Sequence, residues 1–242
     1  MANTDWRGIL FPCPDKWVKN PEERIYIYRT ICEKLGINEI VELPLIETAS
    51  EFKKAKLVER IANSSNKKPL VIGPFHYLTA FVGKNQRETD HIFFDEHSDD
   101  CCDEGMPNYF NNGSFVNFMK GRCFFIGTGE CFFHFKAEGN DLGKSILLRP
   151  HEIFTQQYKK NIFLSFDIDV FSERITKATM WHQGNYNGEM MFSEVKEISA
   201  LICKGRNLTG INVAEYLPCY DSNNYPTADI LINLLNPLIN SE

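Results

Sequence analysis

Short runs of apolar, β-branched or aromatic residues recur along the chain, separated by longer segments with helical patterns. Several runs are continuously hydrophobic, as in PLVIG at 69–73 and NIFLSF at 161–166. Such runs are typical of strands that helices cover on both faces. The other strand-like runs are RGILF (7–11), EIVEL (39–43), HIFF (91–94), RCFFIG (122–127), SILL (145–148) and LTGINVAE (208–215).

Segments between these runs carry the signals of helix starts and stops. Residues 21–36 end in Gly36, as a helix C-cap should, residues 50–62 open with Ser50 as an N-cap, and residues 193–205 begin at Ser193. The alternation predicts an α/β fold, a three-layer α/β/α sandwich with a mainly parallel central sheet, because right-handed crossovers place helices on both faces. No Pro/Gly/Ser-rich stretch divides the chain, so we expect a single domain over 1–242.

Composition narrows the class of protein. The chain is 43% hydrophobic and 24% charged, and no apolar run approaches the roughly 20 residues of a membrane span. The net charge of −6 and the lack of a dense Lys/Arg stripe argue against a nucleic-acid partner. The start MANTDWRGIL has no signal-peptide pattern, so we expect a cytoplasmic, reducing environment and cysteines that are mostly thiols.

Acidic and imidazole side chains gather where three of the predicted strands end. In open parallel sheets, ligands bind beyond the carboxyl ends of the strands, so these residues are expected to share one crevice. Alternate residues of an extended chain also point the same way, which aligns the side chains of the segment DEHSD. The residues are His76 after 69–73, Asp95, His97 and Asp99 after 91–94, and Asp167 and Asp169 after 161–166.

Four carboxylates in one crevice would repel each other without a compensating cation. Carboxylate oxygen together with neutral imidazole suits Mn²⁺, Fe²⁺, Co²⁺ or Zn²⁺, and six ligands are enough for two ions about 3.5–4 Å apart, as in dinuclear hydrolases. Such a pair makes hydroxide from water near neutral pH, so hydrolysis is the expected chemistry. Taken singly, His76 also suits a core histidine, and Asp167 and Asp169 also suit a helix cap or a structural cation site.

The order of these motifs resembles the ureohydrolase family of arginases and agmatinases. DEHSD at 95–99 matches the family's Asp-Ala-His-x-Asp closely, SFDID at 165–169 matches Ser-x-Asp-x-Asp, and IGPFHY at 72–77 matches Gly-Gly-Asp-His-Ser loosely. The resemblance covers roughly residues 69–220. It implies a dimanganese site held by the six residues above, with Fe²⁺ or Co²⁺ as substitutes, and an enzyme that is often a homo-oligomer.

The same resemblance assigns catalytic roles. Glu215, in NVAEYLP at 212–218, matches the acid that holds the substrate guanidinium. A carboxylate can pair with that planar cation through two parallel hydrogen bonds, although a loop carboxylate is the plainer alternative. Asp99 is implied to orient the nucleophile and to relay its proton to the leaving nitrogen. Further substrate contacts are expected from Asn112, Glu130 and His182. For His182, a structural imidazole is the alternative.

Two departures from the family pattern bear on the substrate. Asn112 replaces the proton-shuttle histidine of arginases, and asparagine carries no proton near neutral pH. The segment DCCDEGMPNYF at 100–110 offers acids and apolar groups where free-arginine enzymes grip an α-carboxylate. A substrate without that carboxylate suits the chain better, which leaves agmatine or arginine within a peptide.

The chain is also shorter than a typical ureohydrolase, which suggests an open crevice suited to an extended substrate. We therefore predict a short peptide arginase that converts arginine side chains of a ribosomally made peptide to ornithine and urea. An agmatinase- or arginase-like hydrolase of a small free guanidine compound is the first alternative. A metal-binding homologue without turnover is the second.

Overall fold

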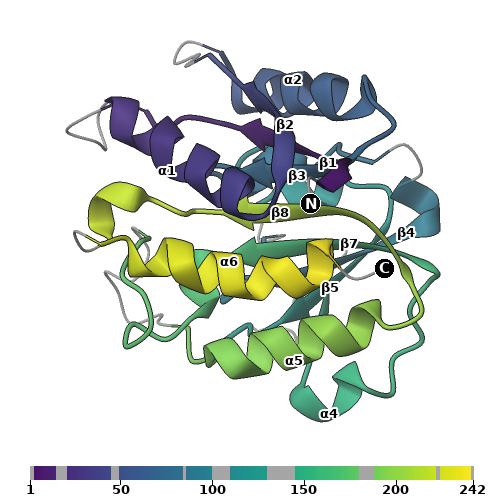
Figure 1. The fold of residues 1–242 in the computed structure, drawn as a ribbon. Helices are drawn as coiled ribbons and strands as arrows, with labels where there is room; N and C mark the ends of the chain where they lie inside the picture. Colours follow the sequence, from purple (N-terminus) through teal and green to yellow (C-terminus); the bar gives the residue numbers. More distant parts are fainter. Residues whose placement is uncertain are drawn as a thin grey trace.

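The computed structural model describes residues 3–14, 21–44, 49–83, 86–99, 110–129, 145–179, 188–221 and 224–240. Its centre is an eight-stranded sheet in which each pair of neighbouring strands is parallel (Figure 1). The order across the sheet is β2-β1-β3-β8-β7-β4-β5-β6. The strands are β1 (Asn3–Leu10), β2 (Ile37–Glu42), β3 (Lys68–Ile72), β4 (Thr89–Phe94), β5 (Arg122–Ile126), β6 (Ser145–Leu148), β7 (Asn161–Asp167) and β8 (Asn207–Ala214).

The sheet is buried on both faces, which explains why its strands read as continuous hydrophobic runs. In β4, Ile92 and Phe94 pack into one apolar cluster, whereas Phe93 packs into another on the opposite face. In β7, Leu164 and Phe163 are divided in the same way. The predicted α/β class, the three layers and the strand-like runs are therefore confirmed.

Helices cover the two faces unequally. Side chains of α1 (Pro21–Lys34), α5 (Phe192–Cys203) and α6 (Pro226–Ile239) join the first apolar cluster, and these helices lie together on the near face in Figure 1. Helix α2 (Glu51–Asn63) contributes Ala55, Val58 and Ala62 to the second cluster. A short helix, α4 (Pro150–Ile153), follows β6.

The observed helix ends lie at or near the residues predicted from capping signals in the sequence. Ser50 caps α2, with its side chain accepting a hydrogen bond from the backbone N of Lys53 at 3.4 Å. Gly36 ends the α1 segment with φ of +77°, a conformation that suits glycine. Helix α5 begins at Phe192, one residue before the predicted Ser193, because the Glu194 carboxylate accepts from the backbone N of Met191 at 2.7 Å.

Helix α6 was not predicted from the sequence. It contains Pro237, which normally marks the end of a helix, and it follows Tyr225 in a left-handed conformation with φ of +47°. Burial of its leucines against the sheet outweighs the lost backbone hydrogen bond. Within the described ranges, no helix has the length and apolar character needed to cross a membrane.

Candidate metal centre

The predicted acids and imidazoles meet at the carboxyl edge of the four central strands. His76 begins a 3-10 helix after β3, Asp95 follows β4, Asp167 ends β7 and Glu215 follows β8. These strands are neighbours in the order β3-β8-β7-β4. The chain therefore brings residues distant in sequence to one point, as the parallel topology requires.

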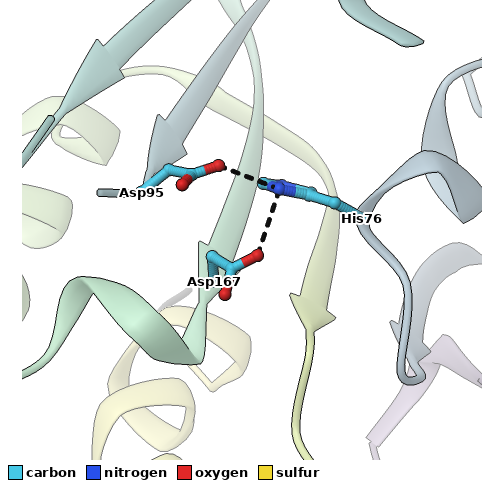
Figure 2. A group of neighbouring side chains, drawn as sticks. All are labelled: His76, Asp95 and Asp167. Atoms are coloured by element: carbon cyan, nitrogen blue, oxygen red, sulfur yellow. Dashed lines mark ion pairs between the residues drawn. The ribbon is translucent and has the colours of Figure 1, made fainter. Parts of the chain in front are cut away.

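Three carboxylates surround one nitrogen of His76, two of them drawn in Figure 2. The Nδ1 atom lies 2.9 Å from Oδ2 of Asp95, 2.9 Å from Oδ2 of Asp99 and 3.2 Å from Oδ2 of Asp167. One N–H cannot serve three acceptors, and Nδ1 and the Oδ2 atoms of Asp95 and Asp99 are buried without a hydrogen-bond partner. A cation would satisfy all of these atoms together.

A second set of ligand atoms lies beside the first. Nδ1 of His97 is 2.8 Å from Oδ2 of Asp169 and 3.7 Å from Oδ1 of Asp95. These residues form two groups that could each hold an ion. The groups are His76–Asp95–Asp167 and Asp95–His97–Asp169. Asp95 belongs to both groups. The side chain of His97 is 32% exposed, so this side of the centre is open to solvent.

Backbone amides orient the aspartates of both groups. Oδ1 of Asp95 accepts from the N–H of His97 at 2.7 Å, and Oδ1 of Asp167 accepts from the N–H of Asp169 at 3.1 Å. The helix-cap alternative for Asp167 is thus realised, but at one oxygen only. In each carboxylate the other oxygen, Oδ2, is directed at His76. A carboxylate that is oriented through one oxygen and presents the other to the centre is suited to ion binding.

Two polar residues that the sequence analysis did not identify support His76. Nε2 of His76 lies 2.7 Å from Oγ of Ser165, and Nδ2 of Asn212 donates to the same oxygen at 2.9 Å. If Nδ1 binds an ion, Nε2 must carry the ring proton, and Oγ of Ser165 then accepts a hydrogen bond from Nε2–H. A signal was present in the sequence, because Ser165 and Asn212 interrupt otherwise apolar strands and are register partners in β7 and β8.

Charges in the centre oppose one another strongly. Burial and the neighbouring Asp95 raise the pKa of Asp99 to about 7, and burial and Asp169 raise the pKa of Asp167 well above its usual range. Burial lowers the pKa of His76, but Asp167, Asp95 and Asp99 outweigh that effect and raise the pKa well above its usual value. Protons thus compensate the crowded carboxylates where no ion does, and an ion would displace them.

Glu215 is buried next to these aspartates and could share an ion with Asp167 and Asp169. Its backbone is left-handed, with φ of +58°. Burial and the carboxylates of Asp167 and Asp169 raise its pKa well above the usual range. Its Oε1 accepts a hydrogen bond from Nδ2 of Asn112, while Oε2 is buried without a hydrogen-bond partner. Asn112, expected to contact substrate, therefore contacts Glu215.

The donor set suits a divalent ion of the manganese type. Both groups that contain Asp95 offer carboxylate oxygen and imidazole nitrogen as ligand atoms. Among the described residues, no such group includes a cysteine. Of the predicted site residues, His76, Asp95, His97, Asp99, Asp167, Asp169 and Glu215 come together, with Asn112 beside them. Glu130 and His182 lie outside the described residues.

Comparisons with known proteins agree with this geometry. A family model described as "Arginase family" matches residues 29–239. No curated protein sequence matches the chain. Among solved structures, arginase from Bacillus subtilis has a TM-score of 0.69 at 16% identity, covering 99% of each chain. A putative agmatinase from Clostridium difficile has a TM-score of 0.69 at 18% identity, covering 98% of this chain and 96% of that one. Formimidoylglutamase from Bacillus subtilis has a TM-score of 0.66 at 15% identity, covering 96% and 86%.

Proposed function

The chain belongs to the arginase family, and from that premise we propose that it is a manganese-dependent ureohydrolase that converts arginine side chains of a peptide to ornithine and urea. The observation that carries the proposal is the meeting of three carboxylate oxygens at Nδ1 of His76, with the buried Glu215 beside them. The family supplies the guanidine chemistry. The peptide is our inference from this chain's own residues.

His76, Asp95, Asp99 and Asp167 would hold one Mn²⁺, and His97 and Asp169 would join Asp95 in holding a second. Bound there, the ions would supply a nucleophile at neutral pH and neutralise developing charge, and Fe²⁺ or Co²⁺ could replace Mn²⁺. The orphaned atoms Nδ1 of His76 and Oδ2 of Asp95 and Asp99 support this assignment.

In the proposed reaction, Glu215 binds the guanidinium through the carboxylate oxygen that has no protein partner. Water adds to the guanidinium carbon, and the bond from that carbon to the side-chain nitrogen breaks. Asp99 takes the proton released by the water and passes it to the departing nitrogen. The products are urea and the amine, which leaves as an ammonium ion after the second proton of the water has also moved to its nitrogen.

Acidic side chains near the candidate centre in the sequence disfavour a substrate with a free α-carboxylate. The segment 100–109, which lies outside the described residues, carries Asp100, Asp103 and Glu104, and these would repel a free α-carboxylate. The amide of Asn112 is already engaged by Glu215 and by backbone N–H groups. A peptidyl arginine has no free α-carboxylate, and neither has agmatine. The alternative is therefore a hydrolase of small amines such as agmatine.

The experiment measures urea release by the Mn²⁺-loaded protein from three probes, a capped tripeptide with a central arginine, agmatine and free arginine. We expect the tripeptide to give the highest kcat/KM, with a product lighter by the mass of cyanamide. Equal or reversed preference would remove the peptide assignment. Release from none of them would favour the non-catalytic, metal-binding alternative.

Glu215→Gln provides a matched catalytic control, because it keeps the shape of the side chain and removes its charge. Each charge-assisted hydrogen bond contributes roughly 1.5–3 kcal/mol, so we expect kcat/KM to fall by about 10- to 150-fold. Bound manganese should stay close to the wild-type amount. Full activity in this variant would show that Glu215 does not bind the guanidinium.

A further inference from the structure

Asn112 joins two parts of the candidate site through one side-chain amide. Its Oδ1 accepts hydrogen bonds from the backbone N of His76 at 2.7 Å and of Tyr77 at 3.3 Å, and its Nδ2 donates to Oε1 of Glu215. A backbone N–H can only donate, so Oδ1 must face His76 and Tyr77. The NH₂ group must then face Glu215, and the orientation of the amide is fixed.

Glu215 requires such a partner because its surroundings repel it. Its side chain is buried, and the carboxylates of Asp167, Asp169, Asp99 and Asp95 all act on it with like charge. Its left-handed backbone, with φ of +58°, is also unfavourable for a residue other than glycine. In the described part of the chain, Asn112 is the donor seen to hold this carboxylate in place.

The arrangement repeats that of the neighbouring aspartates. In Asp95 and Asp167, one oxygen is held by the backbone N–H two residues later, and the other faces the centre. In Glu215, Oε1 is held by Asn112, and Oε2 is buried without a partner. The longer glutamate is held by a side chain where the aspartates are held by the backbone.

We propose that Asn112 is a positioning residue that acts through Glu215, fixing Oε1 so that Oε2 can accept a hydrogen bond from the substrate guanidinium. The inference rests on the proposed function, in which Glu215 binds that group. It also gives the amide at this position a role distinct from proton transfer. Because an amide does not titrate, it holds Glu215 at every pH at which the fold is stable.

Three variants test the proposal. Asn112→Asp keeps an acceptor for the N–H groups of His76 and Tyr77 but turns the donor facing Glu215 into a repelling oxygen. Asn112→Ala removes both functions. Asn111→Asp is the control, since it makes the same change one residue away, where Oδ1 accepts from the backbone N of Gly113 at 2.9 Å and contacts no site residue.

The first readout is the separation of kcat from KM, together with inhibition by guanidinium chloride, which probes the Glu215 position directly. For Asn112→Asp we expect kcat/KM to fall, and inhibition by guanidinium to weaken, by at least about tenfold each, the effect of losing one charge-assisted hydrogen bond. Asn111→Asp should change neither by more than about twofold, because its Oδ1 still accepts from Gly113 and Ser114 and the substitution keeps the shape of the side chain. Bound manganese and thermal midpoint serve as fold controls. A purely structural role would shift those controls and leave inhibition by guanidinium unchanged, which would overturn the proposal.

The second readout does not depend on turnover. Crystal structures of the wild type and of Asn112→Ala should show that the Glu215 carboxylate leaves its place when the amide is removed. If Asn112→Ala does not fold, Asn112→Asp answers the same question, because its acceptor still anchors residues 76 and 77. A carboxylate that stays in place overturns the positioning role. Absence of urea from the wild type would instead refute the proposed function and leave this structural result valid.

Discussion

The side chains of His76 and Asp167 meet across the end of a strand to which neither belongs. His76 follows β3 and Asp167 ends β7, and β8 lies between these two strands in the sheet. Their Nδ1 and Oδ2 atoms are nevertheless 3.2 Å apart (Figure 2). The chain leaves β8 at Glu215, whose backbone is left-handed. The centre is therefore assembled by the sheet as a whole.

Removing the charge of Asp167 should release metal. Asp167→Asn keeps the size of the side chain but offers a weaker ligand next to His76, and we expect bound manganese to fall by at least about half. Elemental analysis of protein loaded with Mn²⁺ and then desalted measures this. Asp229→Asn, the same change on the exposed face of α6, should bind as much as the wild type. Equal metal in both variants would contradict the assignment of Asp167 as a ligand.

Removing the hydroxyl of Ser165 should weaken metal binding without removing a ligand. The hydroxyl lies 2.7 Å from Nε2 of His76 and fixes the proton there, and such supporting contacts typically contribute 10- to 100-fold in affinity. Isothermal titration with Mn²⁺ should show a loss of that size in Ser165→Ala. Ser199→Ala, another buried serine that bonds within α5, is the control. An unchanged dissociation constant would show that Ser165 does not orient the imidazole.

Metal affinity should rise with pH. Burial and Asp95 raise the pKa of Asp99 to about 7, so below that pH a proton occupies a carboxylate that an ion needs. We expect the apparent affinity for Mn²⁺ to fall by at least about tenfold between pH 8 and pH 6. Each proton that the ion must displace lowers the affinity by about tenfold for every pH unit below the pKa of its group. Titration in buffers of different ionisation enthalpy counts the protons released. Affinity that is flat over this range would mean that the carboxylates are already ionised.

His91 should make the fold sensitive to acid. Its two ring nitrogens are buried without a hydrogen-bond partner, and burial, with a further contribution from Lys159 that Asp90 partly opposes, lowers its pKa to about 4. The unfolded chain takes up this proton below about pH 6.5, so stability is lost as the pH falls from 6.5 to 4 and levels off below that. The loss amounts to at most about 3 kcal/mol.

His91→Phe removes this titration and keeps a ring beside Phe93 and Phe163. Urea unfolding at several pH values should therefore give a shallower decline for the variant between pH 6.5 and 4. The exposed His151 provides a control in His151→Phe, which should follow the wild type. Parallel curves for His91→Phe and the wild type would show that His91 becomes protonated without cost to the fold.

Much of the fold could be predicted because its signals are local. Runs such as PLVIG and NIFLSF are apolar at every position since both faces of their strands are covered, and Ser50 and Gly36 mark helix ends through their own backbone preferences. Helix α6 escaped prediction because Pro237 argues locally for a helix end. Packing of its leucines against the sheet decides the matter, and that contact is distant in sequence.

The same distinction applies to the site. The aspartates and histidines could be placed together because each follows a strand and because parallel strands end at one edge. The partners of Ser165 and Asn112 depend on which strands are neighbours, and sequence spacing does not give that order. The hydrogen bond from the Asn112 amide to Glu215 was therefore not predicted, and the expected contact of Asn112 with the substrate stays a prediction. The expected roles of Glu130 and His182 stay predictions.

The position of β8 also governs when the protein can become active as it is synthesised. Of the eight strands described, β8 comes last along the chain, yet it is the only one of them that pairs with both β3 and β7. Without β8, no strand pairing among the described residues would join β1 to β3 with β4 to β7, and the sheet would not fix the distance from His76 to Asp167. Capture of manganese by a nascent chain would therefore report that its sheet has closed.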